Sequence, residues 1–316
     1  MDTRYAPVFL SHGSPMTALD AGPAGAFWRA LGRAIDAGVA AGGTAPSAIV
    51  VLSAHTLALP SVPSRPPRAA APEQGRVPHG GGRGTPRPGR SFTLAGARHQ
   101  AVHDFGGFPQ ALYDLRYEVA GVPCLAPHVE QLLQWAGIEA EHADASGLDH
   151  GIWVPLRDIR PLGDIPVLPV AFPPDCSPEQ LFELGAALSP LIDEGVWIIG
   201  TGSITHNLRL GLPRAEPVAE IPASAAFRTW FAERSAVRDW PALLSYRTQA
   251  PEAQYMHPTD EHLLPWFIAA GAGGPEHAPI RLHASVAGGH LGMDAYAFGA
   301  DARALADGVA AAAATS

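Results

Sequence analysis

Short apolar runs alternate with segments of helical periodicity along the chain, and this alternation predicts an α/β fold. Residues 7–11 and 48–53 are continuous apolar runs that end in small residues, as expected of strands buried on both faces. Between them, residues 23–41 begin with a proline and carry apolar residues at helical spacing, which predicts a crossover helix. The chain is therefore expected to open with a β-α-β unit.

The same alternation recurs in the second half of the chain. The expected elements are strands at 166–171 and 195–200, helices at 178–192, 223–236 and about 260–271, and a glycine-broken, strand-like segment at 281–299. Such alternation is typical of a largely parallel or mixed sheet flanked by helices. We expect a single domain over residues 1–316, with its functional site at the carboxyl ends of the strands.

A stretch at about 57–96 departs from this pattern. Its residues 60–90 are dense in Pro, Gly and Arg and contain no Ile, Leu, Phe, Tyr or Trp, so they cannot form a packed core. We expect a disordered insertion here. A frameshift in a GC-rich gene is the alternative, because all 21 basic residues are Arg, and GC-rich codons read out of frame give Arg, Pro, Gly and Ala.

Charge and composition exclude several classes of partner. The chain has 30 acidic and 21 basic residues, a formal net charge of −9, and no basic cluster outside residues 60–90. Nucleic acid and anionic membrane surfaces are therefore not expected partners. Neither a signal peptide nor a membrane span can be recognised, and the two cysteines show no metal-ligand spacing. A reducing, cytoplasmic location is expected.

Histidines are unusually frequent, and three of the 14 follow predicted strands closely. His12, His55 and His206 each come just after an apolar run, and in open α/β sheets ligands bind beyond the carboxyl ends of the strands. Several imidazoles at one sheet edge each need a polar partner, which one shared metal ion can supply. His12 and His55 are the strongest candidates for metal ligands.

The segment 257–265 offers a third ligand, either His262 or Glu261. An open metal site needs three protein ligands, and neighbouring helical residues point about 100° apart, so both are not expected to bind equally. The segment also resembles a helix start in which Thr259 is the cap and Asp260 complements the helix N-terminus.

Two further histidines are candidates for catalysis. His206 is flanked by Thr205 and Asn207, whose side chains could fix its tautomer, as suits an acid–base role. His150 follows Asp149 at a predicted helix start and is expected to face the same cleft, although capping by Asp149 also explains this turn. Three more histidines are weaker candidates: His103, His257 and His290.

Six segments carry a resemblance to one family: SHGSPM (11–16), LSAH (52–55), HDFGGFPQALYDLRY (103–117), LDHGIWVPL (148–156), GSITHNL (202–208) and HPTDEHLLP (257–265). Together they resemble the extradiol ring-cleavage dioxygenases of the DOPA-dioxygenase type, in the LigB superfamily. The resemblance runs in matching order from about residue 6 to about 298, and only the region 57–100 departs from it clearly.

This resemblance implies an α/β enzyme with one divalent non-haem metal ion that inserts both atoms of O2 into a small aromatic diol. The expected substrate is a catechol, DOPA-like or another catecholic acid, cleaved next to the diol. The matching motifs imply that His12, His55 and His262 hold the metal. They imply that His206 is an acid–base residue or a further ligand, and that His150 meets a substrate hydroxyl or bound oxygen. Fe(II) is expected for activity, while an all-histidine site would also accept Zn(II).

Two other functions use the same residues. A zinc hydrolase would activate water with the same histidines. A non-enzymatic binding protein similar to the Memo proteins would share the fold, but the presence of His150, His206 and the DFGGFP motif favours the dioxygenase.

A carboxylated substrate would need an arginine, for which Arg116, Arg157 and Arg209 are candidates. The sequence does not indicate an oligomeric state.

Overall fold

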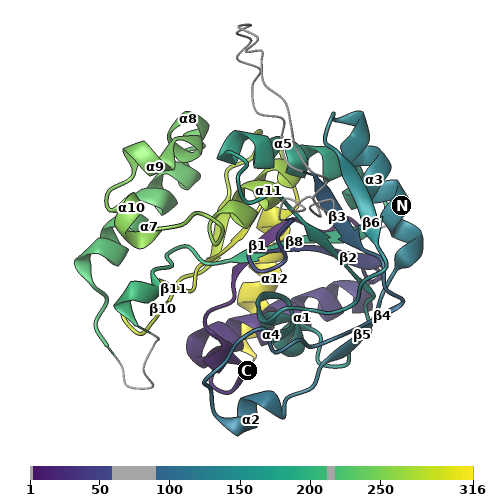
Figure 1. Cartoon of the computed structure of the whole chain (residues 1–316), viewed down its shortest axis with the longest axis horizontal. Coiled ribbons are helices and arrows are strands. Elements are labelled where there is room, and N and C mark those ends of the chain that lie inside the picture. The colour runs from purple at the N-terminus through teal and green to yellow at the C-terminus, as the bar shows by residue number, and fades with distance from the viewer. Residues whose placement is uncertain (1–2, 59–89, 212–217, 316) are drawn as a thin grey trace, which may run out of the picture.

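An eight-stranded mixed sheet forms the centre of the molecule, with helices on both of its faces (Figure 1). The computed structural model describes residues 3–58, 90–211 and 218–315. The strand order is β6-β3-β7-β2-β8-β1-β12-β9. The strands are β1 (Val8–Ser11), β2 (Ala48–Ser53), β3 (Ser91–Leu94), β6 (Ala140–Ala143), β7 (Val167–Ala171), β8 (Val196–Gly202), β9 (Ile280–His283) and β12 (Ala295–Ala297).

The four central strands β7, β2, β8 and β1 are parallel, and antiparallel strands flank them. β2 pairs in parallel with both β7 and β8, and β8 pairs in parallel with β1. β12 is antiparallel to β1 and β9, whereas β3 is antiparallel to β7 and parallel to β6. The sheet is therefore mixed around a parallel centre, and its central carboxyl ends share one edge. Four short strands lie outside it: β4 (Arg98–Gln100), β5 (Glu118–Ala120), β10 (Val286–Ala287) and β11 (Leu291–Gly292).

Each face of the sheet has its own helical layer. On one face α1 (Gly22–Ala40) packs against α4 (His150–Ile159) and α12 (Ala302–Ala314), and on the other α5 (Pro178–Leu188) packs against α3 (Ala126–Trp135) and α11 (Leu264–Gly273). A group of helices lies to one side of the sheet in Figure 1: α7 (Pro222–Ala236), α8 (Trp240–Leu244), α9 (Tyr246–Gln249) and α10 (Ala253–Met256). The remaining helices are α2 (Gln110–Tyr113), α6 (Pro190–Asp193), η1 (Pro15–Ala18), η2 (Pro123–Leu125) and η3 (Leu208–Leu210).

The central strands are apolar throughout because both of their faces are covered. Successive residues of a strand point to opposite faces, so Val50 packs in one core and Ile49 and Val51 in the other. The first core contains buried residues of α3, α5 and α11, and the second contains those of α1, α4 and α12. A continuous apolar run, rather than strict alternation, is therefore the pattern that these strands require.

Most predicted elements are confirmed, and two needed correction. The helix expected over 178–192 is divided, because α5 ends before Ser189 and Pro190 begins the short helix α6. The helix expected from about residue 260 begins only at Leu264, with Pro265 in its first turn, where the missing N–H costs nothing. Thr259 does not cap it and instead donates a hydrogen bond to Glu261.

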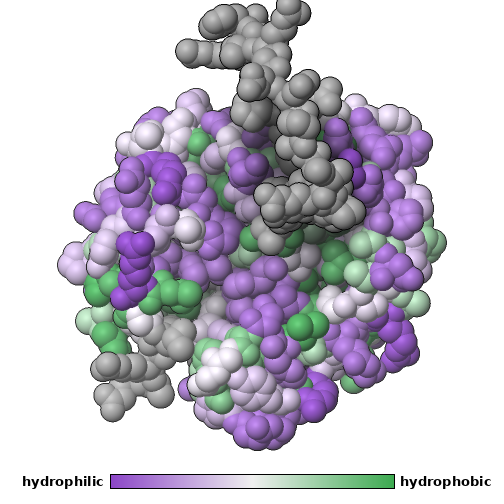
Figure 2. Space-filling model, in the orientation of Figure 1, coloured by the Kyte–Doolittle hydropathy of each residue, from purple (hydrophilic) through white to green (hydrophobic). Residues whose placement is uncertain are grey.

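The predicted insertion at about 57–96 lies mostly at 59–89, outside the described residues. Its last part does not fit the prediction, because residues 91–94 form β3, which pairs with β6 and β7 in the main sheet. No helix within the described ranges is long and apolar enough to cross a membrane. The face shown in Figure 2 is mainly hydrophilic, with apolar residues in small groups.

Candidate active site

Three of the predicted site histidines follow adjacent parallel strands of the sheet. His12 comes directly after β1, His55 two residues after β2 and His206 four residues after β8. Because β2, β8 and β1 are neighbours that run in the same direction, their carboxyl ends bring these residues to one edge. The three histidines therefore meet at the edge of the sheet where ligands bind in open α/β folds.

Two further histidines reach this edge from outside the sheet. His150 is the first residue of α4, and His262 lies in the turn between α10 and α11. The backbone of His262 approaches the end of β8 closely, since its carbonyl accepts a hydrogen bond from the Ser203 N–H at 2.8 Å. A Cβ at Gly202 would lie only 2.0 Å from that carbonyl oxygen, so the absence of a side chain at Gly202 makes the approach possible.

The five rings form one compact cluster. The ring centres of His12, His55 and His262 are 5.0, 4.9 and 5.5 Å apart in pairs. His150 lies 4.1 Å from His55 and 5.4 Å from His12, and His206 stacks on His262 at 3.4 Å. Two sets of possible metal-ligand atoms fall within 4.8 Å: His12, His55 and His150, and His206, Glu261 and His262. Both sets contain members of the predicted ligand trio, and the cluster is a potential metal site.

The tautomer of His12 is fixed by a residue that the sequence did not indicate. The Thr201 hydroxyl donates to the carbonyl of Gly151 at 2.6 Å, so at 2.9 Å it must accept the Nδ1–H of His12. This leaves Nε2 of His12 with a free lone pair, directed to Nε2 of His55 at 3.2 Å. A metal-binding imidazole requires this arrangement, in which the second nitrogen donates to a fixed acceptor.

His150 and His262 each have a carboxylate partner at Nδ1. Asp104 accepts from the His150 ring at 2.9 Å and from its backbone N–H at 3.1 Å, and Glu261 lies 3.1 Å from Nδ1 of His262. Glu261 thus supports the histidine that it was expected to compete with. Asp149 does not cap α4 with its side chain, because its carboxylate accepts hydrogen bonds from the hydroxyls of Ser53 and Thr56.

Burial keeps most of these imidazoles neutral. Burial, followed by the neighbouring imidazoles, holds the pKa of His12 and His262 well below the usual value. The same causes lower the pKa of His55 to about 4 and that of His206 to about 2. Neutral imidazoles have the lone pairs that metal ligands and proton acceptors require.

Four of the five rings, those of His55, His150, His206 and His262, line a cavity of about 570 Å³. Leu57, Phe105, Phe108, Leu208 and Leu291 provide apolar walls, and His290 lines it as well. The rings of Phe105 and His150 are nearly perpendicular, with their centres 5.7 Å apart. A flat aromatic molecule fits such a cavity, which combines apolar walls with a few convergent polar groups.

The weaker candidates and the arginines have varied locations. His290 lines the cavity, whereas His257 is buried behind the site and binds the carbonyl of Ile204, and His103 packs among aromatic rings. Arg116 and Arg157 line a different cavity, and Arg209 is exposed on η3. None of the three arginines is among the described residues that line the histidine cavity.

Sequence reasoning missed Thr201, Asp104 and the supporting role of Glu261. Asp104 lies in the HDFGGFP segment, so the motif was noticed but the residue was given no role. Thr201 carried no signal, since a threonine inside a strand is common for reasons of packing.

Comparison with known proteins identifies the family. Residues 7–299 match the model of the catalytic LigB subunit of aromatic ring-opening dioxygenase. The chain is 37% identical over 201 residues to a 4,5-DOPA dioxygenase extradiol of Beta vulgaris, covering 63% of this chain and 74% of that protein. It is 30% identical over 278 residues to a 4,5-DOPA dioxygenase extradiol of Escherichia coli (strain K12), and the match covers 85% of this chain and 86% of that protein.

A solved structure agrees at the level of the fold. The crystal structure of an uncharacterized protein from Escherichia coli K12 matches with a TM-score of 0.66 and 22% identity, over 94% of this chain and all of that one. The family match covers nearly the whole chain, and it favours the dioxygenase over the hydrolase and the binding protein. This chain therefore belongs to the LigB family and is an aromatic ring-opening dioxygenase of the extradiol type.

Proposed function

We propose that the protein binds one ferrous ion through His12, His55 and His262 and cleaves a catechol next to its diol. The observation that carries this proposal is the set of ring-centre distances of 4.9 to 5.5 Å among these histidines. Three imidazoles that share one ion at metal–nitrogen distances of about 2.0–2.1 Å have ring centres about 5 Å apart. The donor set fits the ion, because imidazole suits both iron and zinc.

A ferrous ion held there would supply the electron transfer to O2 that ring cleavage requires. Three protein ligands leave positions for the diol and for O2. The chain's own residues orient the substrate: Phe105 and Phe108 lie against the cavity as apolar walls. We place the aromatic ring between these walls, with its hydroxyls toward the histidines.

His150 and His206 would divide the proton transfers. Nδ1 of His150 is held by Asp104, so Nε2 can accept a proton from a catechol hydroxyl while the carboxylate stabilises the imidazolium. His206 lies among imidazoles, and burial first and those neighbours second lower its pKa to about 2. His206 is therefore neutral before the substrate binds, so it can accept the proton of the second catechol hydroxyl and return it to the opening ring.

The test is oxygen uptake by protein reconstituted with Fe(II) under anaerobic conditions and then mixed with DOPA, protocatechuate and catechol in turn. We expect one O2 consumed per catechol and a yellow semialdehyde product. Protein loaded with Zn(II) is the control and should consume no oxygen, because zinc has no redox chemistry. Absence of uptake with iron bound contradicts the proposal, and hydrolysis by the zinc form without oxygen would support the hydrolase instead.

A further inference from the structure

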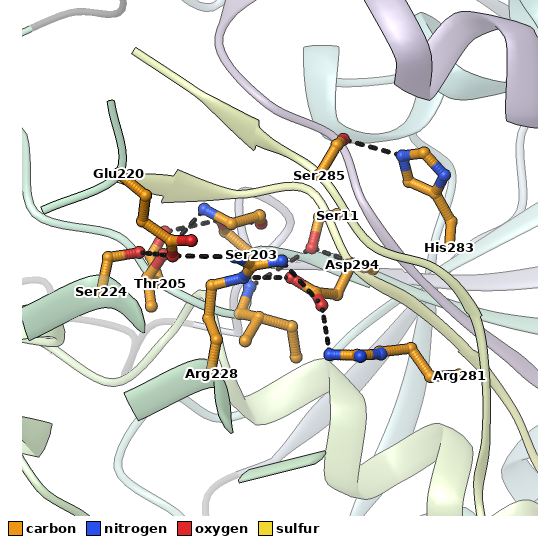
Figure 3. A network of polar contacts seen from close by, with 12 residues as sticks. Ser11, Ser203, Thr205, Glu220, Ser224, Arg228, Arg281, His283, Ser285 and Asp294 are labelled. Atoms are coloured by element: carbon orange, nitrogen blue, oxygen red, sulfur yellow. Dashed lines mark hydrogen bonds and ion pairs between the residues drawn. The ribbon is translucent and has the colours of Figure 1, made fainter. Parts of the chain in front are cut away.

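A buried ion pair lies outside the cavity, since neither of its residues is among the described residues that line it. Arg228 of α7 binds Asp294 through two hydrogen bonds, Nε to Oδ2 at 2.6 Å and Nη2 to Oδ1 at 3.1 Å. The side chain of Asp294 is fully buried and that of Arg228 is 10% exposed. Figure 3 shows Arg228 between Asp294 and Glu220, with Arg281 approaching Asp294 from the other side.

A buried ion pair of this kind contributes little to the free energy of unfolding. Removing two charges from water is costly, and apolar residues of similar size often replace a buried pair without loss of stability. The function of the pair is better sought in the geometry that it fixes. Two parallel hydrogen bonds hold the backbone of Asp294 in one orientation relative to α7.

The backbone of Asp294 is bonded to the residue that precedes His12. Its carbonyl accepts hydrogen bonds from the Ser11 hydroxyl at 2.8 Å and from the Ser11 N–H at 3.2 Å. The same hydroxyl accepts the N–H of Ile204 at 3.3 Å, so it also reaches the segment that leads to His206. Ser11 is almost completely buried.

A second set of bonds joins the segment before His206 to the segment before Asp294. The Thr205 hydroxyl accepts the N–H of Gly292 at 2.7 Å and donates to the carbonyl of His290 at 2.7 Å. The Ser203 hydroxyl lies 3.2 Å from the carbonyl of Gly292. Arg228 itself packs on Gly292, where an added Cβ would lie 2.9 Å from the arginine Cδ. Figure 3 shows Ser11, Ser203 and Thr205 gathered beside the ion pair.

We propose that Arg228 and Asp294 are positioning residues for ring cleavage, which hold the backbone that carries His12 and His206. The inference rests on the roles proposed for these two histidines. The pair acts on His12 through Ser11. It acts on His206 through Gly292 and Thr205. A displacement of about 1 Å at a reacting group can cost about a hundredfold in rate, so small shifts of these segments should be measurable.

The test compares single and double variants. Arg228→Met leaves the buried Asp294 carboxylate with only the longer 3.4 Å contact to Arg281 and should destabilise the protein. Arg228→Met with Asp294→Leu removes both charges and should melt close to the wild type. We expect the double variant to retain a turnover per bound iron about ten- to a hundredfold below the wild type, with little change in KM. Its Zn(II) affinity, measured by titration without turnover, should fall about tenfold, because His12 is displaced.

Two further variants keep the inference falsifiable. Arg160→Met with Asp164→Leu is the matched control, since Arg160 is 12% exposed and pairs with Asp164 away from the cavity. It should keep wild-type turnover and Zn(II) affinity. Thr205→Val removes only the connecting hydroxyl and should lower turnover per iron even if the pair variants do not fold.

A double variant that regains stability, turnover and Zn(II) affinity together would show that the pair is merely structural and would overturn the inference. Wild-type protein that binds iron but opens no catechol contradicts the proposed function instead. In that case, the Zn(II) titrations still decide whether Arg228 and Asp294 position His12.

Discussion

Asp104 binds His150 twice, accepting one hydrogen bond from the ring at 2.9 Å and another from the backbone N–H at 3.1 Å. Burial alone would raise the pKa of Asp104, but these hydrogen bonds and the charge of His150 lower it overall. The carboxylate is therefore ionised at neutral pH, and it fixes both the ring and the first turn of α4. In the second role it satisfies the backbone N–H of His150 at the helix start, which has no partner within the helix.

Asp104→Asn should lower the rate of ring opening and leave the metal in place. The amide cannot stabilise an imidazolium as a carboxylate does, so kcat should fall about a hundredfold, in the range of general acid–base effects. Iron content by metal analysis and kcat by oxygen uptake test this. A loss of metal affinity of about tenfold or more would instead identify His150 as a ligand, because partners of ligands have effects of that size.

Substitution of the five histidines should separate ligands from catalytic residues. We expect His12→Ala, His55→Ala and His262→Ala each to abolish metal retention. His206→Ala should keep most of the metal and lose turnover, since we assign this ring to proton transfer. Metal analysis of the purified variants is the measurement. Full metal binding by His262→Ala, with loss in Glu261→Ala, would move the third ligand to the carboxylate.

Thr201→Val should weaken metal binding indirectly, through its effect on His12. The change leaves the Nδ1–H of His12 and the carbonyl of Gly151 without their shared partner. We expect metal affinity about 10- to 100-fold lower and a stability loss of about 1–3 kcal/mol. Thr93→Val is the matched control, since Thr93 is buried on β3 and its hydroxyl donates to Glu130 of α3. Equal metal affinities in the two variants would contradict the role given to Thr201.

Acid should destabilise the fold partly through His283. Burial first and Arg228 second lower the pKa of His283 to about 4, and its ring stacks on Phe27. The unfolded chain takes up this proton near pH 6.5 and the folded protein only near pH 4, so the stability contribution is lost as pH falls through that window.

The size of this contribution should be about 1 kcal/mol, after allowance for partial exposure of the ring. Urea unfolding of the wild type and His283→Gln at pH 7 and pH 5 is the measurement. The variant should lose less stability than the wild type over this range. An equal loss in both proteins would show that His283 does not contribute.

The elements could be read from the sequence because burial on both faces leaves a simple pattern. Strands β1, β2, β7 and β8 are short apolar runs, and the helices between them repeat their apolar residues at helical spacing. The start of α11 was misplaced because Thr259 and Asp260 resemble a helix cap. In the folded protein Thr259 binds Glu261, while Asp260 binds Tyr246 and Arg247. β3 was missed because it follows the Pro- and Arg-rich stretch directly.

The sequence by itself determined that His12, His55 and His206 would meet, since residues after neighbouring parallel strands share one edge of the sheet. Only the tertiary structure decided which groups hold these rings. The contacts of Thr201 with His12, Asp104 with His150 and Arg228 with Asp294 span 189, 46 and 66 residues. No local pattern encodes such pairs, because hydrogen bonds between distant residues depend on the packing of whole elements.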